Sequence, residues 1–405
     1  MIESEHGPDR LLVADGDPDP RRSGVFPRCG ERLLHADMHN HTRLSDGDGH
    51  PEDAFASMRA AGLDVAAITD HAFGANPWYC LDEDAWRLLG ELADAADEAG
   101  GFVAVRGFEW SSPTLGHMNV WGSRSFTLPL PLAADGAARA IAVEPGPADD
   151  PAAIAAFYDW LVADPERALV SFNHPGREDG RFGRFRFDAR LVERIVGLEM
   201  FNRGDDYLFE RVDIGEVSPL VECLDAGWRV GLMGVTDEHG TRWGFPPDLG
   251  RTGVWARGHD RAALRAAMAA RRIFATRERG LRVDAAAVAA QGLVPMGSRV
   301  DHACGDLLFV LDVDGGPDWV GRALRVQVLQ TGNPLPAVVA EQDVVVPAAG
   351  TLTVTAPVDR ADGDWVVLRL TDPSARGDRR ARPFPHYGSS GRTVAYLSPF
   401  FLGRA

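Results

Sequence analysis

Residues 33–41 read LLHADMHNH, an apolar run that ends in two histidines one residue apart, and LSDGDG follows at 44–49. The apolar run predicts a β-strand, and alternate side chains of a strand point to the same side. His39 and His41 therefore face one way and can share one ion, with the carboxylate of Asp46 five residues further on. This stretch predicts a strand whose end carries candidate metal ligands.

Other short apolar runs share the character of the first one. They lie at 65–70, 102–109, 168–174, 196–202, 229–237 and 252–256. Most are nearly continuous in apolar residues, as strands buried on both faces of a parallel sheet are. Amphipathic helical patterns separate several of them, at 51–62, 82–101, 150–164 and 260–272. Seven strands alternating with helices favour an α/β fold of the (β/α) barrel type over an open sheet, with its chemistry at the carboxyl ends of the strands.

The sequence divides into three regions. Residues 1–30 are rich in Gly, Pro, Asp and Arg and predict an extended lead-in, and residues 31–280 hold the barrel pattern. From 281 to 405 the chain has β-rich segments separated by Gly, Pro and Asp, which predict a small C-terminal β-sandwich.

The charge balance limits the partners. The 405 residues carry a formal net charge of −17, with acidic residues spread along the chain and no basic stripe. A nucleic-acid polymer is therefore not an expected partner, whereas a small anionic substrate fits if bound cations supply positive charge. No apolar run is long enough to cross a bilayer and the first residues lack a signal peptide's apolar core, so we expect a cytoplasmic protein without membrane contact.

Candidate ligands recur where the other predicted strands end. They are His71, Glu109, His117, His174, Asp237 and His239. A single histidine or acid at such a place is more often a hydrogen-bonded or capping residue. Nine such groups, with His39, His41 and Asp46, all fall where a barrel gathers its loops, and this predicts a centre for two or three divalent ions. Imidazole and carboxylate ligands suit zinc, manganese or iron alike.

These residues resemble the motifs of the PHP (polymerase and histidinol phosphatase) superfamily. HNHTRLSDG is similar to its first motif, AITDH to its second, GHMNV and FNHPGR to its middle motifs, and VTDEH to its closing Asp-x-His. The resemblance covers about 33–280 and implies a distorted seven-stranded (β/α) barrel. It also implies three ligand sets: His39, His41, Glu109 and Asp237; Glu109, His117 and His174; and Asp46, His71 and His239. GFEW, GHMNVWG and the β-rich tail with VPMGSRV resemble the carbaryl-hydrolase (CehA/McbA) branch.

The predicted activity is metal-assisted hydrolysis, in which bound cations make hydroxide available near neutral pH and polarise the substrate oxygen. Arg177 and Arg203 are candidates to neutralise the substrate anion, and Asp46 or His239 to transfer a proton. The superfamily resemblance favours a phosphomonoester or phosphodiester, and the branch resemblance allows a carbamate or carboxylic ester. A metal-binding scaffold without catalysis is the alternative from another class. Substrate, metal identity and oligomeric state stay open.

Overall fold

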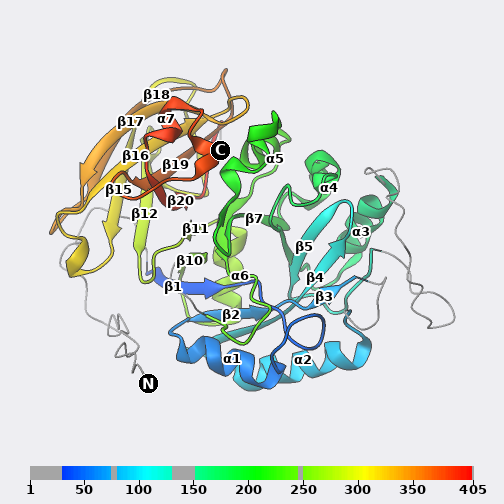
Figure 1. Cartoon of the computed structure of the whole chain (residues 1–405). Helices are drawn as coiled ribbons and strands as arrows, with labels where there is room; N and C mark the ends of the chain where they lie inside the picture. Colours follow the sequence, from blue (N-terminus) through cyan, green and yellow to red (C-terminus); the bar gives the residue numbers. More distant parts are fainter. Residues whose placement is uncertain (1–29, 74–79, 130–150, 245–249, 404–405) are drawn as a thin grey trace.

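The computed structural model describes residues 30–73, 80–129, 151–244 and 250–403, which form a mixed α/β fold rich in sheet (Figure 1). The expected lead-in lies outside the described residues except for its last position. Within the described residues, no helix has the length and apolar character needed to cross a membrane.

The N-terminal strands pair in the order β11, β10, β1, β2, β4, β5, β6, β7 and β9. Their bounds, with those of two short strands, are β1 (Arg32–Asp37), β2 (Val65–Ile68), β3 (His71–Ala72), β4 (Val103–Ser112), β5 (Gly116–Trp121), β6 (Leu169–Phe172), β7 (Ile195–Asn202), β8 (Asp205–Asp206), β9 (Gly231–Val235), β10 (Arg251–Ala256) and β11 (Ile273–Thr276). All seven strands expected from the sequence are present, with ends that differ by a few residues.

The sheet is less regular than the expected alternation of parallel strands and helices. Strand β5 pairs antiparallel with both β4 and β6, and β10 pairs antiparallel with both β1 and β11. The β4–β5 hairpin closes over a short turn that ends at Gly116, whose φ of +106° is open to glycine but strained for other residues. Because the chain reverses here without a helix, the pattern of alternation did not reveal β5.

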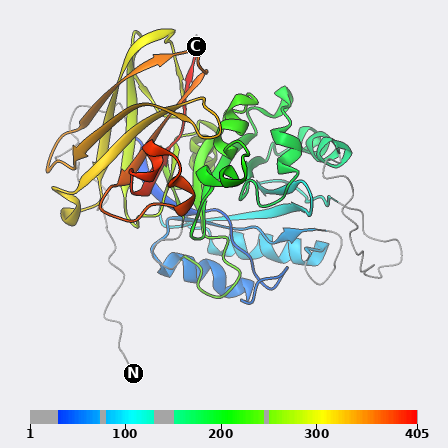
Figure 2. The ribbon, with the colours of Figure 1, turned by 45° about the horizontal axis from the view of Figure 1, so that its top comes forward.

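The described residues form seven α-helices. They are α1 (Pro51–Ala60), α2 (Glu83–Ala96), α3 (Pro151–Ala163), α4 (Arg181–Phe185), α5 (Pro219–Asp225), α6 (Arg261–Ala269) and α7 (Pro385–Gly388). The four longest, α1, α2, α3 and α6, match the four helical patterns in the sequence. Helices α1 and α2 lie side by side beneath β2 and β4, as Figures 1 and 2 show, and bury Phe55 and Leu89 against Ile68. The opposite face of β2 is also buried, which explains its continuous apolar run.

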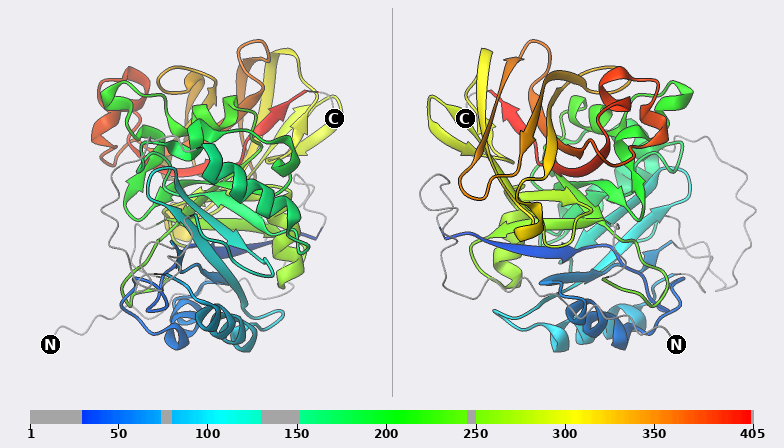
Figure 3. Two further views of the ribbon diagram at one scale, coloured as in Figure 1. Left: turned by 90° about the vertical axis from the view of Figure 1, so that its right-hand side faces the viewer. Right: turned by 60° about the vertical axis from the view of Figure 1, so that its left-hand side comes forward.

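The C-terminal part is built of strands (Figure 3). They are β12 (Arg282–Ala289), β13 (Gly292–Pro295), β14 (Arg299–Val300), β15 (Cys304–Asp314), β16 (Ala323–Gln330), β17 (Ala337–Val345), β18 (Leu352–Asp359), β19 (Trp365–Asp372), β20 (Arg392–Leu397) and β21 (Phe400–Leu402). Strands β13, β12, β15 and β18 form one antiparallel sheet, and β17, β16, β19 and β20 pair antiparallel in a second set. Strand β20 pairs with β11, so the second set continues the sheet of the N-terminal part.

Candidate metal centre

All nine ligand candidates named from the sequence lie together, most of them toward the carboxyl ends of the N-terminal strands and His117 at the start of the antiparallel strand β5. His39 and His41 follow β1, Asp46 lies in the loop before α1, His71 is on β3, Glu109 on β4, His117 on β5, His174 follows β6, and Asp237 and His239 follow β9. Each has a ring nitrogen or carboxylate oxygen within 4 Å of such an atom in another member. The sequence spacing placed these groups at strand ends, and the fold brings the strand ends to one place.

The tightest group joins His39, His41, Glu109 and Asp237. His39 Nε2 lies 3.0 Å from His41 Nε2, 3.1 Å from Glu109 Oε1 and 3.4 Å from Asp237 Oδ1, and His41 Nε2 lies 3.2 Å from the same Asp237 oxygen. Ligands at 2.0–2.1 Å from a tetrahedral ion are about 3.3 Å apart, so these four side chains fit around one cation without moving far. Two ring nitrogens this close need a proton or a metal ion between them, because both cannot present lone pairs.

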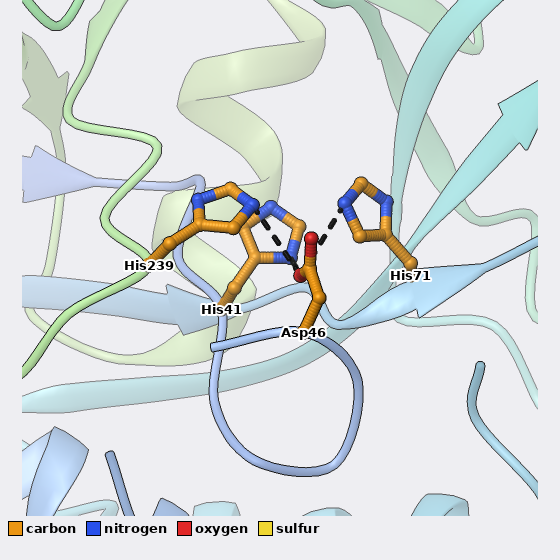
Figure 4. A group of neighbouring side chains, drawn as sticks. All are labelled: His41, Asp46, His71 and His239. Atoms are coloured by element: carbon orange, nitrogen blue, oxygen red, sulfur yellow. Dashed lines mark ion pairs between the residues drawn. The ribbon is translucent and has the colours of Figure 1, made fainter. Parts of the chain in front are cut away.

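A second group surrounds Asp46 (Figure 4). Its Oδ1 lies 3.4 Å from His239 Nε2, 3.6 Å from His71 Nε2 and 3.9 Å from His41 Nδ1. The buried His41 Nδ1 makes no hydrogen bond within the described part of the chain. His41 therefore faces the first group with one nitrogen and the Asp46 group with the other.

Glu109 also serves a third group. Its Oε2 lies 2.7 Å from His71 Nδ1 and 3.3 Å from His117 Nδ1, and its Oε1 lies 3.2 Å from His174 Nε2. A carboxylate with imidazoles on both of its oxygens has the position of a bridge between two ions. The three ligand sets implied by the family resemblance are thus each held together in space, with two additions: His41 joins the Asp46 group, and His71 joins Glu109 and His117.

The sequence analysis missed three polar groups that support these side chains. Glu199 Oε1 lies 2.8 Å from His39 Nδ1, and its other oxygen accepts hydrogen bonds from the backbone N–H of His174 and from Asn202. The only available signal was a single acid within the apolar run that became β7. Asn173 donates to Glu109 Oε1 at 2.8 Å. Metal-binding imidazoles and carboxylates are usually oriented by such outer partners.

Glu178 is the third missed group, four residues after His174. Its carboxylate lies 3.7 Å from His174 Nδ1 and 3.9 Å from His117 Nε2, on the far side of both rings from Glu109. Asp70 holds the loop that carries Asp46, since it accepts hydrogen bonds from the Thr42 backbone and hydroxyl and from the Ser45 hydroxyl. These contacts explain how an irregular loop presents a ligand at a defined position.

The electrostatics of the site call for positive charge. Burial alone would lower the pKa of His39, but Asp237, Glu109 and Glu199 outweigh it and raise the pKa well above the ordinary value. Although burial opposes it, the neighbouring histidines hold the pKa of Glu109 and of Asp237 well below their ordinary values. The metal-free site is therefore a cluster of ionised carboxylates that hold protons on adjacent imidazoles, the state that a metal ion replaces.

The pKa of His41 and the pKa of Asp46 are both lowered, but by different causes. Burial, together with the nearby His71, lowers the pKa of His41 to about 3, so this ring is neutral and available as a ligand. Burial opposes ionisation of Asp46, but the hydrogen bond from His239 and the charges of the surrounding histidines lower its pKa to about 2.

Both arginines named from the sequence lie at the edge of the centre. Arg177 Nη1 lies 3.4 Å from Asp237 Oδ2, and Arg203 donates to the Asp237 backbone carbonyl through Nε at 3.1 Å and Nη2 at 2.8 Å. About half of each side chain is exposed. Arg203, Asp237 and His174 have positive φ angles of 52°, 49° and 27°, and such strained backbone in non-glycine residues is concentrated at functional sites.

Comparison with solved structures finds 11 similar chains, of which three are described here. A two-domain protein from Bacteroides vulgatus that contains a predicted PHP-like metal-dependent phosphoesterase is 15% identical, with 92% of this chain and 96% of that chain covered and a TM-score of 0.45. A protein from Bifidobacterium adolescentis, provisionally described as a metal-dependent phosphoesterase, is 18% identical over 53% of this chain and 90% of its own, with a TM-score of 0.30. An amidohydrolase from Chromobacterium violaceum with bound sulfate and no metal is 15% identical over 53% and 91%, with a TM-score of 0.28.

Two of these three carry the kind of description that the sequence motifs suggested, and the carbaryl-hydrolase branch is not represented among them. No protein-family model matches the chain, and no curated protein does.

Proposed function

We propose that the protein is a metal-dependent hydrolase that acts on a small phosphomonoester or phosphodiester. The observation that carries the proposal is the close approach of His39 Nε2 and His41 Nε2, 3.0 Å apart, with Glu109 and Asp237 oxygens 3.1–3.4 Å away. Buried groups of this kind are costly unless they are paired with a cation, and they lie in the arrangement that a cation requires.

Two or three divalent ions, of zinc, manganese or iron, would be held by the nine candidate ligands. When bound, such ions supply activated water near neutral pH and polarise the substrate oxygen. Glu109 would serve two ions, since imidazoles approach both of its oxygens. Glu199 and Asn173 would fix the orientation of His39 and Glu109 through the hydrogen bonds described above.

The substrate is proposed to be anionic because the two arginines at the edge are half exposed and already turned toward Asp237. The site contains five carboxylates beside these two guanidinium groups, so negative charge is in excess among the groups named. The carboxylates are those of Asp46, Glu109, Glu178, Glu199 and Asp237. An anion would therefore enter only with the ions in place, and Arg177 and Arg203 would then bind its oxygens. Asp46 and His239 are the candidates for proton transfer to the leaving group.

The proposal extends to the type of barrel and to the C-terminal domain. We take the N-terminal strands, within residues 31–280, as a distorted barrel of the PHP type, and 281–405 as a sandwich domain. In support, Thr252 Oγ1 on β10 donates to the Gly234 carbonyl on β9 and accepts from the Gly234 N–H, so a side chain links β9, at one end of the strand order, to the second strand from the other end.

The test is metal analysis and a substrate panel on one preparation. We expect two or three equivalents of metal, hydrolysis of an aryl phosphate, and loss of both metal and activity in His41→Ala. His302→Ala is the matched control, because this histidine contacts the Val358 carbonyl in the C-terminal part. Cleavage of an aryl carbamate but no phosphate would transfer the proposal to the carbamate or carboxylic-ester class. If the purified protein contains no metal and His41→Ala does not change hydrolysis, only the scaffold function remains.

A further inference from the structure

Tyr207 forms a hydrogen bond with Arg177, one of the two arginines at the edge of the metal centre. It begins a 3-10 turn, η3 (Tyr207–Phe209), that follows β8, and the residue is buried. Arg177 Nη2 donates to the Tyr207 hydroxyl at 3.2 Å, while Nη1 of the same guanidinium faces Asp237 Oδ2. The arginine is thus held between a phenol and a carboxylate, while 41% of its side chain stays exposed. A long side chain held on two sides needs less ordering when an anion binds.

The turn that carries Tyr207 is fastened by Asp206. This buried carboxylate accepts from the Leu208 backbone N–H with Oδ1, which caps the turn. The same oxygen accepts from the Tyr396 hydroxyl at 2.8 Å, and Oδ2 accepts from the Thr393 hydroxyl at 2.7 Å. Tyr396 and Thr393 both lie on β20, almost two hundred residues further along the chain. The position of the turn is therefore set by a strand of the C-terminal part.

A buried arginine completes this chain of hydrogen bonds. Thr393 Oγ1 accepts from Arg369 Nη2 at 2.8 Å, and Arg369 lies on β19 with its guanidinium also bonded to Gln327 and Ser390. The guanidinium carbon stands 5.5 Å from the ring centre of Phe209, the last residue of the turn. One hydroxyl thus stands between the buried positive charge of Arg369 and the buried negative charge of Asp206, which favours their joint burial.

We infer that Tyr207 is a positioning residue that holds Arg177 at the metal centre, and that β19 and β20 keep Tyr207 in place through Asp206. The described C-terminal strands then contribute none of the candidate metal ligands but determine where the anion-binding guanidinium lies. The inference rests on the proposed function only in giving Arg177 a substrate anion to bind.

The test measures the freedom of Arg177 directly. Phenylglyoxal modifies accessible arginines, and the rate at each site can be followed by peptide mass spectrometry, without substrate or metal. We expect Tyr207→Phe to speed modification of Arg177 by about threefold to tenfold, the effect of losing one ordinary hydrogen bond at a half-exposed side chain. Thr393→Val should change the rate in the same direction, because it removes a hydrogen bond that holds Asp206. Tyr158→Phe is the matched control, because this buried phenol donates to the Arg186 carbonyl and not to Arg177. Should Thr393→Val fail to fold, Tyr396→Phe tests the same link.

A second measurement connects the position of Arg177 with anion binding. Inorganic phosphate binding to the metal-loaded protein is compared in Tyr207→Phe, Arg177→Met and the double variant. We expect Tyr207→Phe to weaken binding about fivefold alone and not at all beside Arg177→Met, because a residue acting only through Arg177 has nothing left to position. An unchanged labelling rate in Tyr207→Phe, or an equal loss in both backgrounds, overturns the inference. Absence of phosphate binding together with faster labelling overturns the proposed function and supports the positioning.

Discussion

Glu199→Gln is the variant that best tests whether the buried carboxylates exist to prepare a metal site. Glu199 is fully buried on β7 and is not one of the nine candidate ligands. One oxygen faces His39 Nδ1 at 2.8 Å, and the other accepts from His174 N–H at 2.7 Å and from Asn202 Nδ2 at 2.9 Å. Glutamine keeps the shape but removes the charge and turns one acceptor into a donor.

The size of the effect follows from these contacts. If the amide oxygen keeps the bonds from His174 and Asn202, its NH2 faces His39 Nδ1, so that nitrogen must act as the acceptor. His39 would then carry its proton on Nε2, the atom that points at Glu109 and Asp237 and that a metal ion needs. Outer partners of this kind change metal affinity by about 10- to 100-fold, which equals about 1.4–2.7 kcal/mol.

The assay is competition for metal against a chelator of known affinity, followed by measurement of bound metal. Glu193→Gln is the control, since this acid is largely exposed and pairs with Arg271. A folded Glu199→Gln protein whose metal affinity lies within twofold of the wild type would refute the reasoning. A circular-dichroism spectrum and melting temperature of the metal-free variant separate a local effect from loss of the fold.

Three further outcomes are expected. Metal binding at pH 7 should release protons, because neighbouring carboxylates raise the pKa of His39, His71 and His239 despite their burial, and a metal ion displaces the protons that these rings hold. Calorimetry in two buffers of different ionisation enthalpy measures the number of protons released. The same raised pKa values stabilise the metal-free fold, fully below pH 6.5, and this stabilisation is lost as the pH rises through the folded-state pKa values. Chelator-treated protein should therefore have a lower melting temperature at pH 9 than at pH 6.5. The difference should be smaller when metal is bound. Gly49→Ala should destabilise by about 1–3 kcal/mol in denaturant unfolding, because the new Cβ would lie 2.0 Å from the Trp243 ring; unchanged stability would contradict the packing.

Gly49 is connected to the metal centre through Trp243. The Trp243 indole N–H donates to the His41 carbonyl at 3.0 Å, so the ring that Gly49 touches also supports a candidate ligand. Gly49→Ala should therefore lower metal affinity as well as stability. Glu52→Gln on the exposed side of α1 is the control, because Glu52 does not line the cavity that Gly49 and Trp243 share.

Much of the candidate site was predictable from the sequence because its signals are local. A histidine pair in alternate positions after an apolar run, as at His39 and His41, follows from the repeat of an extended chain. Polar ligands at the end of each buried strand follow from the way parallel strands present their carboxyl ends together. The seven strands and four helices that frame the site are likewise properties of short segments.

What the sequence alone determined is therefore the identity of the groups and the end of each strand on which they stand. Only the tertiary structure decided which atoms face each other, that Glu199 and Glu178 stand behind the imidazoles, and that β5 reverses the chain. It also brought Asp206 to β20 across nearly two hundred residues. Such contacts depend on how distant segments pack, and a lone acid or tyrosine carries no local pattern that reveals its partner.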